Sequence, residues 1–322
     1  MLLRKTIATT LLVSLLVGCS SAPEKEPVNT QELSVAITSW IGFAPLYVGQ
    51  ELGFYEENGV DLDIQFIDDI GAIKAAVQAD KTDLTWGTGD MLPLFTEAGL
   101  DLKAFYAIDW SNGGDGVVVS DKYTQWSDFE GVSFAAQSGF PPANLFLYAL
   151  AQNGVDVSKV EIQEMDTSAA ALAFKAGQVD IAALFQPYLS QAAEREDGSI
   201  FISSAEYPYV ITDYFSAKPQ LLEAKKETIA NFIKATDQAI EYLNSNPEEA
   251  AVITAPFFGL TTEDAIATFQ DVEFPSLAEN KKLFNSSDIK KTFNTFASAM
   301  RQAGLITKEI DVESLYTTDF VN

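Results

Sequence analysis

Apolar residues follow two alternating patterns along most of the chain, one with a period of two and one with a period of three to four. Apolar and polar residues alternate over residues 33–38 and 60–67, as in half-buried strands. Ile73, Ala76 and Val77 recur instead at helical spacing. The predicted order is strand 33–38, a Gly/Pro loop that opens a helix running toward Gly53, strand 60–67, a helix from Asp69 or Gly71, strand 83–86, a turn at 87–89 and another helix.

A repeat at a spacing of about 97 residues predicts the same elements a second time. Residues 42–45 recur at 139–142, Asp69 recurs as Asp166, residues 76–84 recur at 173–181, and residues 59–62 recur at 154–157 with a spacing of 95. Four matches in one order indicate two related units, although each match alone is weak. The second copy predicts strand 132–135, a helix from Pro142, strand 160–165, a helix from Ser168 and strand 179–184.

The last third of the chain predicts one more strand and two long helices. Residues 210–216 are expected to form a return strand. Apolar residues at three- and four-residue steps predict one amphipathic helix over 221–243 and a second one through Ile289, Phe293, Phe296 and Met300. Ser287 or Asp288 caps the second helix and Gly304 follows it. We expect both helices to pack mainly on the first unit.

Alternating strands and helices predict an α/β protein with two parallel or mixed sheets, each flanked by helices. We expect two lobes, with lobe I formed by residues 33–115 and 209–322 and lobe II by residues 116–208. The two crossover segments between the lobes then form a hinge suited to closing on a ligand. Because ligands of open α/β sheets lie beyond the carboxyl ends of the strands, the predicted site is the cleft between the lobes.

The N-terminal residues indicate export. A basic pair, Arg4-Lys5, precedes an apolar run at 7–17 that is too short to cross a bilayer, which needs about 20 residues. The run ends in a segment that resembles a bacterial lipobox and contains Cys19, the single cysteine. We expect a signal peptide over 1–18, a lipid anchor on Cys19 and a flexible tether over 19–32, in the periplasm or on the outer face of the cell membrane. The alternative is an ordinary signal peptide with an incidental cysteine.

Composition narrows the possible chemistry. The chain has 20 Lys and Arg against 46 Asp and Glu, and the resulting net charge of −26 disfavours nucleic acid as a partner. It has no His, which excludes His-based triads and His metal ligands, and one Cys cannot form a disulfide framework. We expect no metal and no cofactor. No Gly-rich phosphate loop ending in Gly-Lys-Ser/Thr is present, so any ATPase that serves this protein is another polypeptide.

Several segments together resemble a known family. The lipobox, residues 40–47 (WIGFAPLY), 51–55 (ELGFY) and 59–62 (GVDL) are similar to the opening of the substrate-binding proteins that serve ABC importers for nitrate, sulfonates, taurine and thiamine-pyrimidine precursors. The resemblance extends from residue 33 to about residue 245. It implies a two-lobed periplasmic-binding-protein fold, a small ligand in the cleft and delivery to a membrane permease driven by a separate ATPase. We expect a monomer that is not an enzyme.

The loops at the predicted strand ends are the candidate site. They carry Ser39, Trp40, Gly42, Phe43, Thr88, Gly89, Asp90, Asp109, Trp110, Ser111, Asp115, Gln137, Ser138, Gly139, Phe140, Phe185, Gln186, Tyr188, Asp213 and Tyr214. Gly42 and Gly139 let the backbone approach a ligand and leave helix-start N–H groups free to donate. We favour the cleft for Trp40 and the lobe core for Trp86, and leave both open for Phe43.

The charges on these loops set the chain apart from the nitrate and sulfonate members. None of the three Arg lies on a predicted cleft loop, so no Arg clamp for an oxyanion is evident. The loops carry Asp90, Asp109, Asp115 and Asp213 instead, with Trp40, Trp110, Phe140 and Tyr188 as aromatic faces, and this combination suits an amine or ammonium group. The alternatives are that these acids cap helices and turns, or that helix N-termini and hydroxyls alone hold an anion. A neutral or cationic nitrogen compound is favoured over a sulfonate.

Two other functional classes are the alternatives, and the chain lacks residues that the first would need. The thiamine-pyrimidine synthase branch of this fold family in fungi would, by resemblance, need His and a Cys-rich segment, and this chain has no His and one Cys. A lipid-anchored sensor or interaction lipoprotein that feeds no permease would share the fold. A neighbouring permease and ATPase gene distinguishes the importer from the sensor. We expect the importer's substrate-binding protein, which captures an amine, a pyrimidine or a sulfonate.

Overall fold

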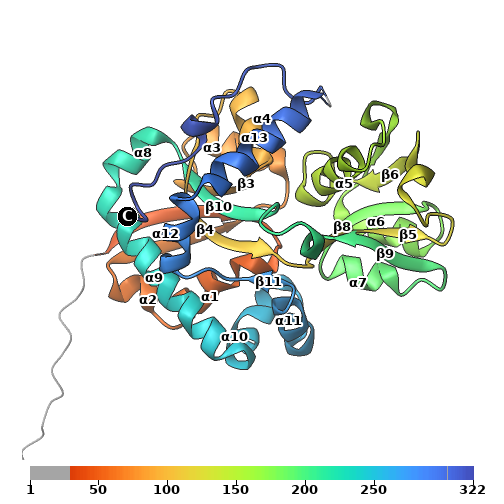
Figure 1. Cartoon of the computed structure of the whole chain (residues 1–322). Helices are drawn as coiled ribbons and strands as arrows, with labels where there is room; N and C mark the ends of the chain where they lie inside the picture. The colour runs from red at the N-terminus through yellow and green to blue at the C-terminus, as the bar shows by residue number, and fades with distance from the viewer. Residues whose placement is uncertain (1–29, 303) are drawn as a thin grey trace, which may run out of the picture.

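The computed structural model describes residues 30–302 and 304–322, so the predicted signal peptide and Cys19 lie outside the described residues. Two sheets with flanking helices lie side by side (Figure 1). The six-stranded sheet has the order β11-β4-β10-β3-β1-β2 and the five-stranded sheet the order β7-β6-β8-β5-β9. We call the first sheet with its helices lobe I and the second lobe II. The expected fold class, two mixed sheets flanked by helices, is confirmed.

The strands of lobe I are β1 (Gln31–Ile37), β2 (Val60–Phe66), β3 (Leu84–Thr88), β4 (Lys103–Ser111), β10 (Thr212–Ala217) and β11 (Val272–Glu273). Those of lobe II are β5 (Asp115–Ser120), β6 (Ser133–Ala136), β7 (Glu161–Glu164), β8 (Ile181–Phe185) and β9 (Gly198–Ser203). In each lobe three parallel strands, β2-β1-β3 and β7-β6-β8, are followed by one antiparallel strand, β10 or β5. The repeat in the sequence therefore corresponds to a repeat in topology.

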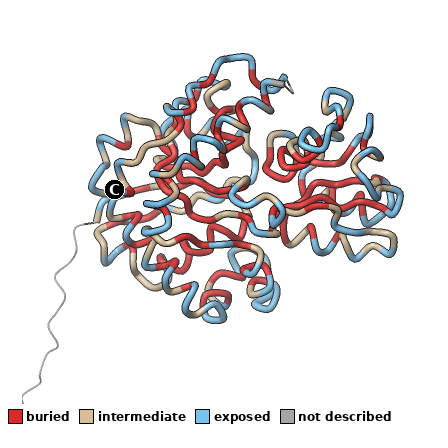
Figure 2. The backbone as a smooth tube through the Cα atoms, in the orientation of Figure 1, coloured by how far each residue is buried: buried red, intermediate tan, exposed pale blue. Residues whose placement is uncertain are grey.

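The helices cover both faces of each sheet. Lobe I contains the 3-10 turn η1 (Ile41–Phe43) and α1 (Ala44–Glu51), α2 (Phe54–Glu57), α3 (Ile70–Gln78) and α4 (Met91–Glu97), and lobe II contains α5 (Pro141–Gln152), α6 (Thr167–Lys175) and α7 (Tyr188–Ala193). The C-terminal helices are α8 (Pro219–Ala224), α9 (Lys226–Ser245), α10 (Pro247–Thr254), α11 (Thr262–Phe269), α12 (Leu277–Phe284) and α13 (Ser287–Gln302). They pack on lobe I, and the strands they cover are largely buried (Figures 1 and 2). No helix within the described residues is long and apolar enough to cross a membrane.

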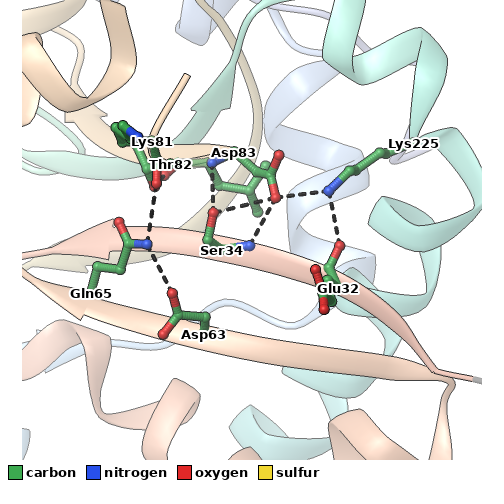
Figure 3. Close-up of polar contacts among 9 residues, drawn as sticks. Glu32, Ser34, Asp63, Gln65, Lys81, Thr82, Asp83 and Lys225 are labelled. Atoms are coloured by element: carbon green, nitrogen blue, oxygen red, sulfur yellow. Dashed lines mark hydrogen bonds and ion pairs between the residues drawn. The ribbon is translucent and has the colours of Figure 1, made fainter. Parts of the chain in front are cut away.

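Two predicted elements differ from the structure. The turn expected at 87–89 is wrong in part, because Gly87 and Thr88 continue β3 and pair with Tyr214 and Asp213 of β10. The single helix expected over 221–243 is two helices, α8 and α9. Lys225 at their junction leaves helical geometry (φ −110°, ψ 26°), and its ammonium donates to the carbonyl of Glu32 (2.9 Å) and to the carboxylate of Asp83 (2.8 Å), as Figure 3 shows.

The chain passes between the sheets twice, through residues 112–114 and through residues 204–211. Ser111 Oγ, at the end of β4, lies 2.7 Å from Ser204 Oγ on the second connection, and Gly113 N–H on the first connection donates to Ser204 Oγ (2.8 Å). The two connections are therefore hydrogen-bonded to each other. Asp115 opens β5 in lobe II, although we had placed it at the end of lobe I. That these connections act as a hinge stays a prediction.

The fold makes α9 the main helix of the lobe I core. Phe232 on α9 is fully buried and packs against Phe215 of β10 (ring centroids 5.2 Å apart) and Tyr55 of α2 (5.7 Å). We expect Phe232→Ala to lower the free energy of unfolding by about 3–5 kcal/mol, because it leaves a cavity among these rings. Lys234→Ala on the exposed side of α9 is the matched control and should change it by less than about 0.5 kcal/mol. Urea unfolding measures both, and equal losses would contradict this packing.

Candidate functional site

A cavity of about 370 Å³ lies between the lobes, beyond the ends of strands from both sheets. We call it the outer cavity. Its lining comes from lobe I (Thr38, Ser39, Asp68, Asp69) and from lobe II (Gln137, Phe140, Asp166, Thr167, Ser168, Phe185, Tyr188). Its volume suits a small organic molecule.

Two helices of the repeat begin at the outer cavity, and a carboxylate caps each of them. Asp69 accepts a hydrogen bond from Ala72 N–H (2.7 Å) at the start of α3, and Asp166 accepts one from Ala169 N–H (2.9 Å) at the start of α6. Asp68 accepts from the N–H of Ser39 (2.9 Å). Helix N-termini attract anions, and here the chain's own carboxylates already lie at both.

A smaller cavity of about 20 Å³ adjoins the outer one, because Thr38, Phe140 and Phe185 line both. We call it the inner cavity. The rest of its lining is Trp40, Trp86, Asp115, Pro141, Ile211 and Asp213. A cavity of this size has room for one water-sized group.

Four carboxylates in this region are almost completely buried, and two of them, Asp115 and Asp213, line the inner cavity. Asp109 of β4, Asp213 of β10 and Thr88 of β3 form one row across three strands, paired in register. The register of β4 shifts beside Asp213, and such bulges commonly redirect side chains at functional sites. Asp115 stands at the start of β5 in lobe II, and Asp90 precedes α4. The exposed fractions of the four residues lie between 0% and 4%.

Burial raises the pKa of all four carboxyls. The pKa of Asp109 and that of Asp115 rise to about 7, mainly through loss of solvent, with the indole N–H of Trp40 opposing the shift at Asp109. Burial raises the pKa of Asp213 well above its ordinary value, and the negative charges of Asp109, Asp115 and Asp90 raise it further. Burial also raises the pKa of Asp90, and the hydrogen bond from the Asn144 amide opposes that rise. Without a cation, the four carboxyls therefore cannot all be ionised at neutral pH.

Trp40 is held between two glycines. Its indole N–H donates to Asp109 Oδ1 (3.1 Å), and the residue is 7% exposed. A Cβ at Gly42 would lie 2.2 Å from Trp40 Nε1 and 2.2 Å from Asp109 Oδ2, and a Cβ at Gly114 would lie 2.5 Å from Trp40 Cη2. Both positions need glycine because of this close approach. The carboxylate of Asp109 thus lies against Gly42, where we expected free N–H groups at the start of a helix.

The lobes touch each other around the two cavities. Trp40 meets Phe185 edge to face (centroids 6.1 Å apart), and Trp86 meets Phe140 (6.4 Å). The amide of Asn144 on α5 donates to the carboxylate of Asp90. Gln186 Nε2 donates to Asp271 Oδ2 (2.9 Å) on the loop before β11. The two lobes are therefore in direct contact beside the cavities.

Most of the predicted site residues lie at or next to these cavities. Ser39, Gln137 and Tyr188 line the outer cavity, Trp40, Asp115 and Asp213 line the inner one, and Phe140 lines both. Thr88 and Asp109 are the register partners of Asp213 on the two adjacent strands, and the charge of Asp90 contributes to the raised pKa of Asp213.

Other predicted residues have different surroundings. Phe43 is core, packed on Trp86 (5.6 Å) and Phe215 (6.3 Å), because η1 turns it into lobe I. Trp110 packs on Tyr209 of the second connection (5.1 Å), since its neighbour Asp109 takes the cavity side of β4.

The predicted glycines and polar residues also contact other parts of the fold. A Cβ at Gly89 would approach Phe293 of α13 (3.2 Å), and Gly139 takes a left-handed turn (φ 79°). The N–H of Ser138 donates to the carboxylate of Glu164. The Gln186 amide donates to Asp271, and the Ser111 hydroxyl is hydrogen-bonded to that of Ser204. Tyr214 is buried against Phe284 and Phe293 in lobe I.

Sequence reasoning missed several lining residues. Trp86 was assigned to the core, yet its ring lines the inner cavity while its residue is only 3% exposed. Asp69 and Asp166 were found as members of the repeat, and their shared spacing was the signal that they occupy equivalent places. Nothing in the sequence singled out Thr38, Asp68 or Ile211.

The described residues that line the two cavities include no Lys and no Arg. Within residues 30–302 and 304–322, no group of three or more Asp, Glu, Cys or His is arranged to hold a metal ion. The site therefore offers carboxylates, hydroxyls, amides and aromatic faces to a ligand.

Two mixed sheets joined by two connections, with a cavity between them, define the periplasmic-binding-protein class of fold. The structure is similar to the periplasmic aliphatic sulphonate binding protein SsuA of Escherichia coli (TM-score 0.74, 16% identity, 89% of this chain and 92% of that one). It is also similar to the periplasmic nitrate-binding protein NrtA of Synechocystis (TM-score 0.63, 13% identity, 90% and 92%). The protein YtlA of Bacillus subtilis is 26% identical over 260 residues, 77% of each chain.

The chain belongs to the NMT1/THI5-like family, whose model matches residues 40–250. This confirms the family resemblance.

The carboxylate cluster predicts how stability depends on pH. The facing groups are Asp90, Asp109, Asp115 and Asp213, with Asp271 at the edge, and burial raises the pKa of each. Between pH 4 and about 7 the folded state therefore holds protons that the unfolded chain has released. Stability is then largest at the acidic end of this window and is lost as pH rises through about 7.

We expect the free energy of unfolding of the ligand-free protein to fall between pH 5 and pH 7.5, by about 2 kcal/mol or more. Asp213→Asn should reduce this fall, because asparagine neither titrates nor repels Asp109. Asp121→Asn, an exposed position in lobe II, is the control and should keep the slope of the parent. Urea unfolding at four pH values measures the slope, and a rising or flat profile in the parent would contradict the raised pKa values.

Proposed function

We propose that this protein is the extracytoplasmic substrate-binding protein of an ABC importer. One observation carries the proposal: residues of both lobes line a cavity of about 370 Å³ at the strand ends. A ligand there touches both lobes and favours the closed arrangement over an open one. The names of SsuA and NrtA, a sulphonate-binding and a nitrate-binding protein, support a small nitrogen- or sulfur-containing nutrient as the ligand class.

The partners follow from this role. The closed protein presents its ligand to permease subunits in the membrane, and a separate ATPase drives transport. We propose that the protein works as a monomer that binds without transforming its ligand. The signal peptide over 1–18 would direct export and be removed, and a lipid on Cys19 would hold the protein on the outer face of the cell membrane, or in the periplasm, through the tether over 19–32.

A lipid-anchored sensor that feeds no permease is the alternative, because ligand-driven closure serves signalling as well as transport. Permease and ATPase genes next to the gene for this protein favour the importer.

The first test is ligand binding. We expect one class from a panel of amines, betaines, pyrimidines, sulfonates and nitrate to raise the melting temperature, because a ligand at 100 times its Kd stabilises the folded state by about 2.7 kcal/mol. The same ligand should reduce the radius of gyration in small-angle scattering if the free protein samples an open form. Absence of any thermal shift across the panel would count against a substrate-binding role.

The second test is the anchor. Cys19→Ala should abolish incorporation of labelled palmitate, because the thiol is the acylation site of a lipobox. Cys19→Ser should lose the label as well, because it also removes the thiol. Ser20→Ala is the matched control and should keep the label. Label retained on Cys19→Ala would remove the lipoprotein proposal and leave an ordinary signal peptide.

A further inference from the structure

We infer that the inner cavity holds the primary ammonium group of the ligand and that the outer cavity holds the rest of the molecule. This inference rests on the proposed function and names the ligand class: a compact organic cation with a terminal amine. It differs from the sulphonate and nitrate named for the related structures.

The first argument is a set of buried acceptors without donors. Asp90 Oδ1, Asp109 Oδ2 and Asp213 Oδ1 have no hydrogen-bond partner, although their residues are at most 3% exposed. Asp213 lines the inner cavity, and Asp109 is its register partner on the adjacent strand. Buried polar groups are normally paired. A proton shared between the Asp109 and Asp213 carboxyls supplies one donor in the free protein, and a ligand with N–H donors would satisfy these oxygens while both carboxyls are ionised.

An ammonium group meets that need. It brings three N–H donors and one positive charge, and its hydrogen bonds to carboxylates are charge-assisted. The inner cavity of about 20 Å³ has room for one water-sized group, which fits a primary ammonium and not a trimethylammonium or a sulfonate. Trp86 Nε1–H, also buried and unpaired, is a donor in the same lining and would be satisfied by a carboxylate oxygen or by an acceptor on the ligand.

The second argument concerns anions. The N–H groups at the starts of α3 and α6 are capped by Asp69 and Asp166, and the carboxylate of Asp109 lies against Gly42 at the start of η1. An anion in either cavity would meet carboxylates where it needs donors, and no Lys or Arg among the described lining residues would offset them. Each of these helix starts, where an oxyanion could otherwise bind, thus carries a negative side chain.

The third argument links the cation to closure. Asp90, Asp109 and Asp213 belong to lobe I, and Asp115 belongs to lobe II. Ionised carboxylates on opposite lobes repel each other in the closed cleft, and a cation between them turns this repulsion into attraction. The aromatic rings of Phe140, Phe185 and Tyr188 then cover the body of the ligand in the outer cavity.

Four probes with one benzyl body and different heads test the inference: benzylamine, benzyl alcohol, benzyltrimethylammonium and phenylmethanesulfonate. Calorimetric titration of the soluble protein without residues 1–19 at pH 7.5 should give benzylamine at least tenfold tighter binding than each of the other three. Asp213→Asn and Asp115→Asn should each weaken benzylamine at least tenfold and leave benzyl alcohol unchanged. Asp121→Asn, which is exposed and follows the opposite end of β5 from Asp115, is the control and should bind as the parent does.

The number of protons released on binding distinguishes pairing with the ligand from a merely structural role of these residues. Carboxyls that hold protons in the free protein must ionise to pair with the ammonium, so the binding heat of benzylamine should vary with the ionisation enthalpy of the buffer. Affinity should also fall as pH drops from 7.5 to 5.5, because the carboxyls of Asp90, Asp109, Asp115 and Asp213 are then protonated. Asp213→Asn should reduce the number of protons released.

Several outcomes would overturn the inference. Tighter binding of phenylmethanesulfonate or benzyl alcohol than of benzylamine would show that the head site does not select an ammonium. Equal binding of benzyltrimethylammonium would show that the inner cavity does not hold the head. If benzylamine does not bind at millimolar concentration, the inference fails too. The proposed function still stands in each case if another class of the panel stabilises the protein, and it fails only when no class does.

Discussion

The central constraint in this protein is the presence of buried negative charge without a fixed counterion. Asp90, Asp109, Asp115 and Asp213 lie where the two lobes meet, and the lining residues that the structure describes include no basic side chain. An isolated buried carboxylate is costly, so the free protein must keep part of the cluster protonated or keep the lobes apart. The rest of the site is arranged around this cluster. Trp40 hydrogen-bonds to it, two glycines make room for Trp40, and the aromatic contacts between the lobes close over it.

This arrangement also explains why local capping and ligand recognition are divided among different acids. Asp68, Asp69 and Asp166 face the outer cavity, and each accepts a backbone N–H, so their charge is largely satisfied by the fold. Their role is to shape the cavity and to occupy helix starts. The cluster at the inner cavity keeps unpaired carboxylate oxygens instead, which leaves acceptors for another molecule. Capping and ligand binding were equal alternatives for Asp90 at the sequence level. In the structure Asp90 precedes α4 without a side-chain capping bond and accepts from Asn144 of the other lobe.

Much of this fold could be predicted from the sequence, because period-two and period-3.6 patterns report burial directly, and the repeat at Asp69 and Asp166 showed that two units share one topology. The failures came from long-range pairing. Thr88 looked like part of a turn because its partner, Asp213, lies far along the chain. Trp86 looked like core because a buried strand residue and a residue lining a closed cavity have the same hydrophobic pattern. Sequence placed Asp109 and Asp213 on candidate loops but gave no sign that the two are register partners.

The two connections between the lobes lie very close to the carboxylate cluster in the chain. Asp115 directly follows the first connection, Asp213 comes two residues after the second, and Ser111 and Ser204 tie the connections together. Groups next to a pivot move less than groups far from it when two rigid bodies rotate. If the lobes open about these connections, the inner cavity should keep more of its shape than the outer one. A ligand would then be recognised first by its charged head, at a nearly preformed anchor, and the outer cavity would close around its body afterwards.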